Sequence, residues 1–192
     1  MQRSIVSIAV FCGSNFGDSD AYAEGARQLG VTLARSGITL VYGGTTKGLM
    51  GIVANALLEA GGSAHGVITE RLQRRGHAHP DLTRSEVVAT LRIRKERMVA
   101  LADAFIAMPG GIGTIEEMME VWAMNQLGEI DKPVGLLEID RFYATFLAFI
   151  EHMVETKFLP PAHRHSICID SDARALIGKL RAHVKSDVPK WL

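Results

Sequence analysis

Residues 104–117, AFIAMPGGIGTIEE, decide how this chain is expected to fold. The run 104–107 is short and wholly apolar, which is typical of a buried parallel strand. Residues 114–127 then place apolar side chains at the spacing of one helix face, namely Ile115, Met118, Met119 and Trp122. The glycines in between let backbone N–H groups approach a ligand, and the start of a helix adds partial positive charge. The stretch therefore predicts a strand, an anion-binding loop and a helix, with phosphate as the natural occupant.

The same stretch also has a purely structural interpretation. Thr114 and Glu117 have the spacing of a capping box, and glycines punctuate many strand-to-helix turns. Three glycines within four residues, followed by the acids Glu116 and Glu117, favour a ligand loop instead. A carboxylate next to a phosphate site suits chemistry beside the phosphate, for instance at the sugar of a nucleotide.

Length and charge narrow the classes of protein. The 192 residues fit one domain, residues 1–192, with enough chain for a sizeable core. Lysine plus arginine equals aspartate plus glutamate at 21 each, so the charge indicates neither nucleic acid nor an acidic membrane as a partner. No apolar run reaches the ~18 residues of a membrane span, and residues 1–10 read better as a first strand than as a signal peptide. Cys12 and Cys168 make no disulfide framework or zinc quartet, and we expect a cytoplasmic protein.

Strands and helices alternate along the chain. Strands are expected at residues 4–11, 38–42, 64–68, 86–89, 104–107, 133–137 and 166–169. Helices are expected from a cap at 18–20 to residue 35, up to residue 60, and over 91–101, 114–127, 142–158 and 172–184, the last capped by Ser171 or Asp172. Residues 69–85 are basic and expected to be irregular, and Pro160 and Pro161 break the chain. This alternation predicts an α/β fold with a doubly wound, mostly parallel sheet, helices on both faces and ligands at the carboxyl ends of the strands.

Three loops should meet at that edge of the sheet: residues 12–15, 43–51 and 109–114. Neither glycine loop fits G-x-G-x-x-G with an acid ending the next strand, so a dinucleotide fingerprint is absent. Lys47 is not in a GK[ST] context, which excludes a Walker A motif. The loops therefore favour a mononucleotide over NAD or ATP with magnesium. Lys47 itself is equally compatible with contact to phosphate or with solvent.

Several motifs together carry a resemblance to a known family. Residues 109–117, PGGIGTIEE, match the pattern PGGxGTxxE, and Arg94-Lys95 lies where that family carries an Arg-Lys pair. Further matches to its loops are FCGS at 11–14, YGG at 42–44 and GLMG at 48–51. On these residues, and over about 6–180, the sequence resembles the Lonely Guy family of cytokinin riboside 5′-monophosphate phosphoribohydrolases, whose members were often labelled lysine decarboxylases.

The resemblance implies a Rossmann-like fold, a homodimer with active sites shared across the interface, and no metal or other cofactor. It implies hydrolysis of the N-glycosidic bond of a purine nucleoside 5′-monophosphate, either adenosine monophosphate (AMP) or its N6-prenylated form, to free base and ribose 5-phosphate. Carried over position by position, Arg94 and Glu117 would be the catalytic pair. The implied phosphate-binding residues are Gly110, Gly111, Gly113 and Thr114. The other implied substrate-binding residues are Ser14, Gly44, Lys95, Ile112, Ile115 and Glu116.

These residue types suit the implied reaction. Loss of a purine from ribose passes through an oxocarbenium-like state. The Glu117 carboxylate would stabilise that charge, hold a ribose hydroxyl or orient the attacking water. Arg94 stays protonated, so its role would be to position groups and to stabilise charge on the phosphate or the leaving base.

Three positions depart from the family pattern. Arg92 replaces a histidine, Thr45 replaces a third glycine, and Gly76 stands where an acid is common. By analogy these positions surround the base and sugar, so they bear on which base is preferred.

Two other functions stay open. A nucleotide sensor that binds without cleaving would fit altered loops, and a lysine decarboxylase would need pyridoxal phosphate on a lysine with an acid partner, for which we find no arrangement in the sequence.

Other chemistry-bearing side chains receive structural interpretations. The histidine pairs 77/79 and 163/165 lack a third metal ligand at suitable spacing, so we expect surface histidines and no metal. Cys12 is expected to be a small buried residue rather than a nucleophile, and Trp122 to pack rather than stack on a base. The methionines are expected to fill the core and dimer contacts: Met98, Met108, Met118, Met119 and Met124.

Overall fold

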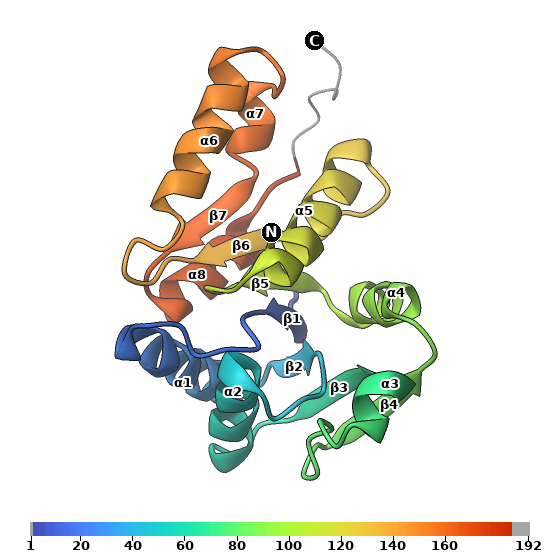
Figure 1. Ribbon diagram of the computed structural model, residues 1–192. Helices are drawn as coiled ribbons and strands as arrows, with labels where there is room; N and C mark the ends of the chain where they lie inside the picture. Colours follow the sequence, from blue (N-terminus) through green and yellow to red (C-terminus); the bar gives the residue numbers. More distant parts are fainter. Residues whose placement is uncertain (1, 186–192) are drawn as a thin grey trace.

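The computed structural model describes residues 2–185, so the ends of the predicted domain, residue 1 and residues 186–192, lie outside the described part of the chain. Within it, seven strands form one sheet in the order β4-β3-β2-β1-β5-β6-β7, and every neighbouring pair is parallel (Figure 1). The strands are β1 (Ser7–Phe11), β2 (Thr39–Tyr42), β3 (Ala64–Thr69), β4 (Arg84–Val88), β5 (Ala104–Ala107), β6 (Val134–Leu137) and β7 (Ile167–Asp170). The predicted doubly wound parallel sheet is confirmed, and the strands differ from their predicted ranges only at the ends.

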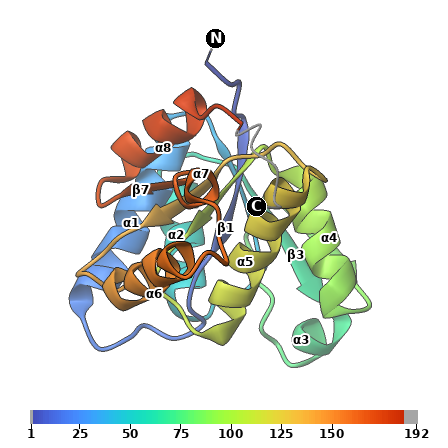
Figure 2. The same cartoon turned by 90° about the horizontal axis from the view of Figure 1, so that it is seen from above.

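Helices cover both faces of the sheet, as predicted, and Figure 2 shows α1 and α8 on one side of β1 with α4 and α5 on the other. The helices are α1 (Asp20–Arg35), α2 (Gly48–Glu59), α3 (Glu70–Arg74), α4 (Leu91–Leu101), α5 (Ile112–Leu127), α6 (Ala144–Glu155), α7 (Pro161–Arg164) and α8 (Ala173–Ala182). Side chains of α1, α2 and α8 share one apolar core, and side chains of α4, α5 and α6 share the other. In β1, Ile8 and Val10 join the first core, while Ala9 and Phe11 join the second. Among the described helices, none is both long enough and apolar enough to cross a membrane.

Two segments hold more structure than their sequence indicated. The expectation that residues 69–85 are irregular is wrong, because they contain α3 and the start of β4. The Thr69 side chain caps α3 by accepting from the N–H of Leu72 at 3.4 Å. The expected break at Pro160 is followed by α7, in which Pro161 takes a first-turn position that needs no backbone N–H donor.

Two helices begin at residues that the sequence offered as caps, Ser19 for α1 and Asp172 for α8. Ser19, one of three candidates, caps α1 by accepting from the N–H of Ala21 at 3.3 Å. Asp172, rather than Ser171, caps α8 by accepting from the N–H of Ala175 at 2.8 Å. Both caps satisfy backbone donors that the helix itself cannot pair.

The strand order reverses between β1 and β5, which are neighbours at the centre of the sheet. The chain leaving β1 enters α1 on one face, and the chain leaving β5 enters α5 on the other, so a crevice opens between their loops. The Gly13 N–H donates to the Pro109 carbonyl at 3.0 Å, and the Leu49 N–H donates to the Gly13 carbonyl at 3.0 Å. The three loops that the sequence placed at one edge of the sheet therefore do meet there.

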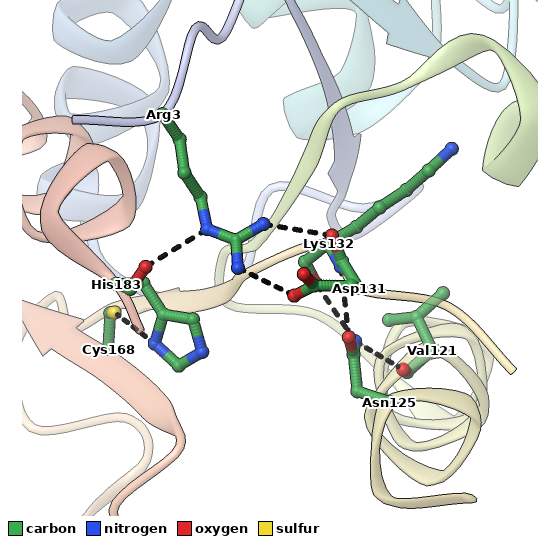
Figure 3. A network of polar contacts seen from close by, with 7 residues as sticks. All are labelled: Arg3, Val121, Asn125, Asp131, Lys132, Cys168 and His183. Atoms are coloured by element: carbon green, nitrogen blue, oxygen red, sulfur yellow. Dashed lines mark hydrogen bonds and ion pairs between the residues drawn. The ribbon is translucent and has the colours of Figure 1, made fainter. Parts of the chain in front are cut away.

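A polar network lies at the opposite, amino-terminal end of the strands (Figure 3). The Arg3 guanidinium donates to the carbonyl of His183 at 2.9 Å and pairs with the Asp131 carboxylate at 2.6 Å. Asn125 closes the turn after α5 by donating to the carbonyl of Lys132 at 2.8 Å. These contacts join the two ends of the described chain and fix where β1 and β6 begin, on the side of the sheet away from the crevice.

Candidate active site

The glycine loop after β5 is open where a ligand would approach. α5 begins at Ile112, and its cap residue, Gly111, offers no side-chain hydrogen bond. The capping-box interpretation of Thr114 and Glu117 is therefore wrong, because both residues lie inside the helix rather than at its start. The first N–H groups of α5 have no side-chain acceptor from a cap, so they are available to an anion.

The three glycines of this loop differ in their surroundings. Gly110 is tightly packed, whereas Gly111 and Gly113 face open space. A Cβ on Gly110 would overlap Thr114 Oγ1 and lie 2.8 Å from the backbone nitrogen of Gly13, so a larger residue would push the loops after β5 and β1 apart. A Cβ on Gly111 or Gly113 would meet nothing within 4 Å. The loop thus presents bare backbone to open space at Gly111 and Gly113, as a phosphate site requires.

A cavity of about 680 Å³ lies against this loop. Its lining includes most of the predicted site residues: Ser14, Arg94, Lys95, Gly111, Ile112, Gly113, Thr114, Glu116 and Glu117. A second cavity of about 360 Å³ is joined to the first, with which it shares four lining residues: Ser14, Met50, Leu72 and Arg94. Volumes of this size are typical of sites for small molecules, and a nucleoside monophosphate is of that class.

Three predicted residues lie outside the main cavity. Gly110 lines a further cavity of about 260 Å³, which shares Gly13, Ser14 and Gly111 with the main cavity. Gly44 is buried in a left-handed conformation, with φ at 67°, and its carbonyl accepts from the N–H of His79 at 2.9 Å. Ile115 packs against the apolar core behind α5. Gly44 and Ile115 therefore shape the loops that carry the site and do not line either of the two joined cavities.

Arg94 on α4 and Glu117 on α5 meet inside the main cavity. Arg94 Nη2 lies 3.5 Å from Glu117 Oε1, and the two side chains are only 12% and 16% exposed. Gly43, directly after β2, makes room for this arrangement, since a Cβ there would lie 2.5 Å from Arg94 Nη2. Arg94 Nε is buried without a hydrogen-bond partner among the described residues. A buried charged donor in this state favours a ligand oxygen beside it.

Burial changes the protonation behaviour of Glu117. Loss of hydration raises the pKa of its carboxyl, the Arg94 guanidinium opposes the shift, and the negative charge of Glu116 adds to it. The pKa therefore lies above the ordinary value of 4.5. A titratable group perturbed by both burial and a specific charge, inside a cavity, is typical of a catalytic site.

Lys95 joins α4 to α5 at the rim of the cavity. Its ammonium contacts the carboxylate of Glu116 and lies 3.1 Å from Glu120 Oε2. Burial acts to lower the pKa of Lys95, but the bonds to the two carboxylates outweigh it, so the pKa is raised and the side chain stays charged. Lys95 thereby offsets two negative charges beside the loop, which reduces their repulsion of a phosphate.

Some residues lining the cavities carry no sequence signal for a site. Leu72 lines both cavities, yet it lies on α3, in the segment that was expected to be irregular. The other lining residues of this kind are Leu91 and His77. Lys47, for which both interpretations were open, lines the second cavity, although its side chain is also exposed. These residues come from α3, from α4 and from loops, and the topology of the sheet brings them together.

Cys12 and Trp122 are buried, as predicted, although Cys12 also lines the main cavity. Cys12 is buried, and burial raises the pKa of its thiol far above the usual range, so the reactive thiolate is disfavoured. Trp122 packs in the second core, and its Nε1 donates to Ser166 Oγ at 3.0 Å. Of the methionines, Met98, Met108 and Met118 are buried in the two cores, and Met119 and Met124 are partly buried.

The expectation of surface histidines is wrong for His79 and His163, which are both buried. His79 Nε2 lies 2.8 Å from Asn55 Oδ1, and its Nδ1 accepts from the N–H of Asp81 at 3.2 Å. These bonds satisfy a neutral ring, and burial accordingly lowers the pKa of His79. In the described part of the chain, no three histidine, cysteine or acidic side chains come together in a group that could hold a metal ion.

Tyr143 supports the glycine loop from the protein interior. Its hydroxyl donates to the carbonyl of Met108 at 2.6 Å, in a fully buried position. We expect Tyr143→Phe to lower the free energy of unfolding by about 1–3 kcal/mol, because a buried carbonyl loses its partner. Urea denaturation checks this, with Tyr42→Phe as the control, since the buried Tyr42 hydroxyl has no partner among the described residues. Equal losses of stability in the two variants would contradict the assigned role of Tyr143.

The fold and the cavity define a class: a doubly wound α/β protein with an open glycine loop at the switch point of its sheet. Residues 50–180 match a family model described as "Possible lysine decarboxylase". A cytokinin riboside 5′-monophosphate phosphoribohydrolase of Arabidopsis thaliana is 42% identical over 177 residues, which cover 92% of this chain and 83% of that protein. A protein of the same name from Rhodococcoides fascians is 41% identical over 177 residues, covering 92% and 89% of the two chains. The chain belongs to the Lonely Guy family, as its motifs indicated.

The fold also occurs in a more distant solved structure. The molybdenum cofactor binding protein of the phototrophic bacterium Rippkaea orientalis superposes with a TM-score of 0.68 over 92% of this chain and 95% of the other. The two sequences are 22% identical, so this likeness concerns the fold alone.

Proposed function

We propose that this protein hydrolyses the N-glycosidic bond of a purine nucleoside 5′-monophosphate, giving the free base and ribose 5-phosphate. The observation that carries the proposal is the buried pair of Arg94 and Glu117, 3.5 Å apart, in the same cavity as the open glycine loop. We propose this pair as the catalytic residues. The relatives from Arabidopsis thaliana and Rhodococcoides fascians are named for the same class of reaction on cytokinin riboside 5′-monophosphates.

The 5′-phosphate is proposed to bind the loop after β5. The bare backbone at Gly111 and Gly113 and the uncapped start of α5 direct N–H donors and partial positive charge toward one region of the cavity. Thr114, which also lines the cavity, adds a hydroxyl. Arg94 Nε, buried without a partner among the described residues, offers a further charged donor.

Glu117 then lies one helical turn beyond the phosphate loop, beside the ribose. As the bond to the base breaks, positive charge builds on the sugar ring, and the attacking water supplies a hydroxyl to C1′ and a proton that ends on the base. The Glu117 carboxylate stabilises the sugar charge and orients the water, and its burial strengthens both effects because little water screens them. The Arg94 guanidinium opposes the raised pKa of Glu117 and so favours its ionised form.

The second cavity is the space left for the base. Its lining combines polar and apolar side chains, namely Thr45, Lys47, Met50, Leu72 and His77. Two of the three departures from the family pattern line the joined cavities: Thr45 the second and Arg92 the first. The third, Gly76, is next to His77 in the chain. We therefore propose a purine nucleotide, AMP or an N6-substituted form, with the choice set by this cavity.

We further propose a homodimer in which the partner subunit covers the open side of the site. Ile112 and Leu91 line the main cavity, yet they are 91% and 61% exposed. Large apolar side chains grouped in this way at a cavity mark an interaction surface. Analytical ultracentrifugation measures the mass, and a monomer at all concentrations would contradict the dimer.

We also propose a cytoplasmic location. Cys12 and Cys168 are free thiols, which agrees with it.

The proposed function is tested by measuring free base released from a panel of nucleoside 5′-monophosphates, including AMP, its N6-prenylated form and a pyrimidine nucleotide. We expect release from a purine nucleotide, and a loss of about 10²-fold or more in kcat/KM for the matching nucleoside, because binding to the phosphate loop then contributes nothing. Tight binding of nucleotides without release from any of them would overturn the hydrolase and favour a nucleotide sensor.

A further inference from the structure

α4, the helix that carries Arg94, is attached to the protein by apolar packing on one face and by ion pairs to α5 and β4. Of its eleven residues, all of them described, only Met98 is fully buried. The α5 side of the helix is held by Lys95, whose ammonium pairs with Glu116 and Glu120. Val99 and Leu101 pack partly buried against the same core as Met98, and polar contacts on both sides of the helix add to this packing in holding its position.

A bidentate ion pair fixes that other side of α4. Arg97 Nε and Nη2 donate to the two carboxylate oxygens of Glu86, on β4, at 2.9 Å each. Glu86 Oε1 also lies 3.0 Å from Nε2 of His65 on β3, whose side chain is only 10% exposed. The Glu86 carboxylate on β4 therefore bonds to α4 and lies beside β3. The bond from Arg97 holds the pKa of Glu86 below its usual value, so the carboxylate is charged at neutral pH.

The ion pair lies close to the catalytic arginine in the chain. Arg97 and Arg94 are three residues apart, about one turn of the same helix. Arg94 Nη2 and Glu117 Oε1 are 3.5 Å apart, at the limit of a hydrogen bond, so a small displacement of α4 would separate them. Glu86 itself does not line either of the joined cavities.

We propose that Glu86 is a positioning residue for the glycosidic reaction: by holding Arg97 it fixes α4 on the sheet and thereby keeps Arg94 against Glu117. The inference rests on the proposed function, because the placement of Arg94 affects a rate only if the site is catalytic. It assigns a role to a residue outside the cavity that no motif of the sequence includes.

The test compares Glu86→Gln with the wild-type chain. We expect kcat for base release to fall about 10- to 100-fold, because misplacing a catalytic group by a fraction of an ångström is costly. KM should rise by less than kcat falls, since the backbone donors of the phosphate loop are untouched and only the Arg94 donor moves. Amide hydrogen exchange over residues 91–101 should speed up by about tenfold, as α4 opens more often. Arg97→Gln removes the positive charge, whereas Arg97→Lys keeps the charge but loses the bidentate contact with Glu86. The kcat of Arg97→Lys should therefore be higher than that of Arg97→Gln but lower than that of the wild type.

Glu151→Gln provides the matched control. It removes an ion pair of 2.6 Å that joins α6 to Arg164 on α7, and neither residue lines the joined cavities, so kcat should not change. A wild-type kcat in Glu86→Gln, or unchanged exchange over 91–101, would overturn the inference. If the wild-type chain releases no base from any nucleotide, the proposed function fails instead, and the exchange experiment alone still decides whether Glu86 anchors α4.

Discussion

The Glu117→Gln variant is expected to lose about 10²- to 10³-fold in kcat for base release while still binding nucleotide. Glutamine keeps the shape of the side chain but carries no negative charge, so the positive charge that builds on the ribose is no longer stabilised. The phosphate loop, with its open backbone at Gly111 and Gly113, is untouched, so binding should persist. Base release under single-turnover conditions measures the chemical step, and calorimetric titration with AMP measures binding.

Glu129→Gln is a suitable control for this variant. Glu129 is exposed just beyond the far end of α5, so the control makes the same change of charge away from the cavity. Its kcat should match the wild type. A Glu117→Gln protein with wild-type turnover would remove Glu117 from the mechanism, and one that binds no AMP would show that the residue serves binding instead.

The pH dependence of the wild-type enzyme should report the same group. Burial raises the pKa of Glu117 above the ordinary 4.5, and the reaction requires the ionised form. The rate should therefore be fully developed at high pH and fall as the pH drops through the raised pKa, at a higher pH than an ordinary carboxyl would give. The fall should be absent from the residual activity of Glu117→Gln. A rate that rises as the pH drops would contradict a carboxylate role.

The parts of the fold and site that a short stretch of sequence encodes, such as an apolar run or a glycine loop, could be predicted from the sequence. The run 104–107 is apolar on both faces, and both faces of β5 are indeed covered. The glycine loop 109–114 follows a strand, and the switch-point rule then places it beside the loop after β1. Arg94 is different, because the charged run 92–97 reads by itself as a solvated helix face. Only the resemblance to a family singled it out.

The rest depended on contacts between segments far apart in the chain. Thr114 and Glu117 have the spacing of a capping box, but α5 already begins at Ile112. The spacing alone does not predict that the helix starts within the glycine loop. His79 looks like a surface residue until the chain brings Asn55 beside it. Leu72, on α3, lines the site only because α4 and α5 bring the rest of the lining to the same edge of the sheet. None of these pairings has a periodicity that a sequence could display.

The Arg94→Gln variant is expected to lower kcat by about 10²-fold and to shift the acidic limb of the pH profile upward. Arg94 opposes the raised pKa of Glu117, so removing the guanidinium raises that pKa further and leaves less carboxylate at neutral pH. The variant should therefore recover part of its lost activity at higher pH. Arg94→Lys retains a charge but loses the planar guanidinium, and we expect a smaller shift of the limb with a loss of kcat that persists. An unshifted limb in Arg94→Gln would show that the two charges do not interact in the working enzyme.

The double variant Arg94→Gln/Glu117→Gln decides whether the pair acts as a unit. If Arg94 works partly by keeping Glu117 ionised, then its loss should cost much less once Glu117 is already glutamine, and the two losses in kcat should not multiply. Thermal unfolding of all three variants checks that the comparison is between folded proteins. Losses that multiply fully would mean that Arg94 acts on the phosphate or the leaving base alone, and the distance of 3.5 Å between the two side chains would then carry no catalytic meaning.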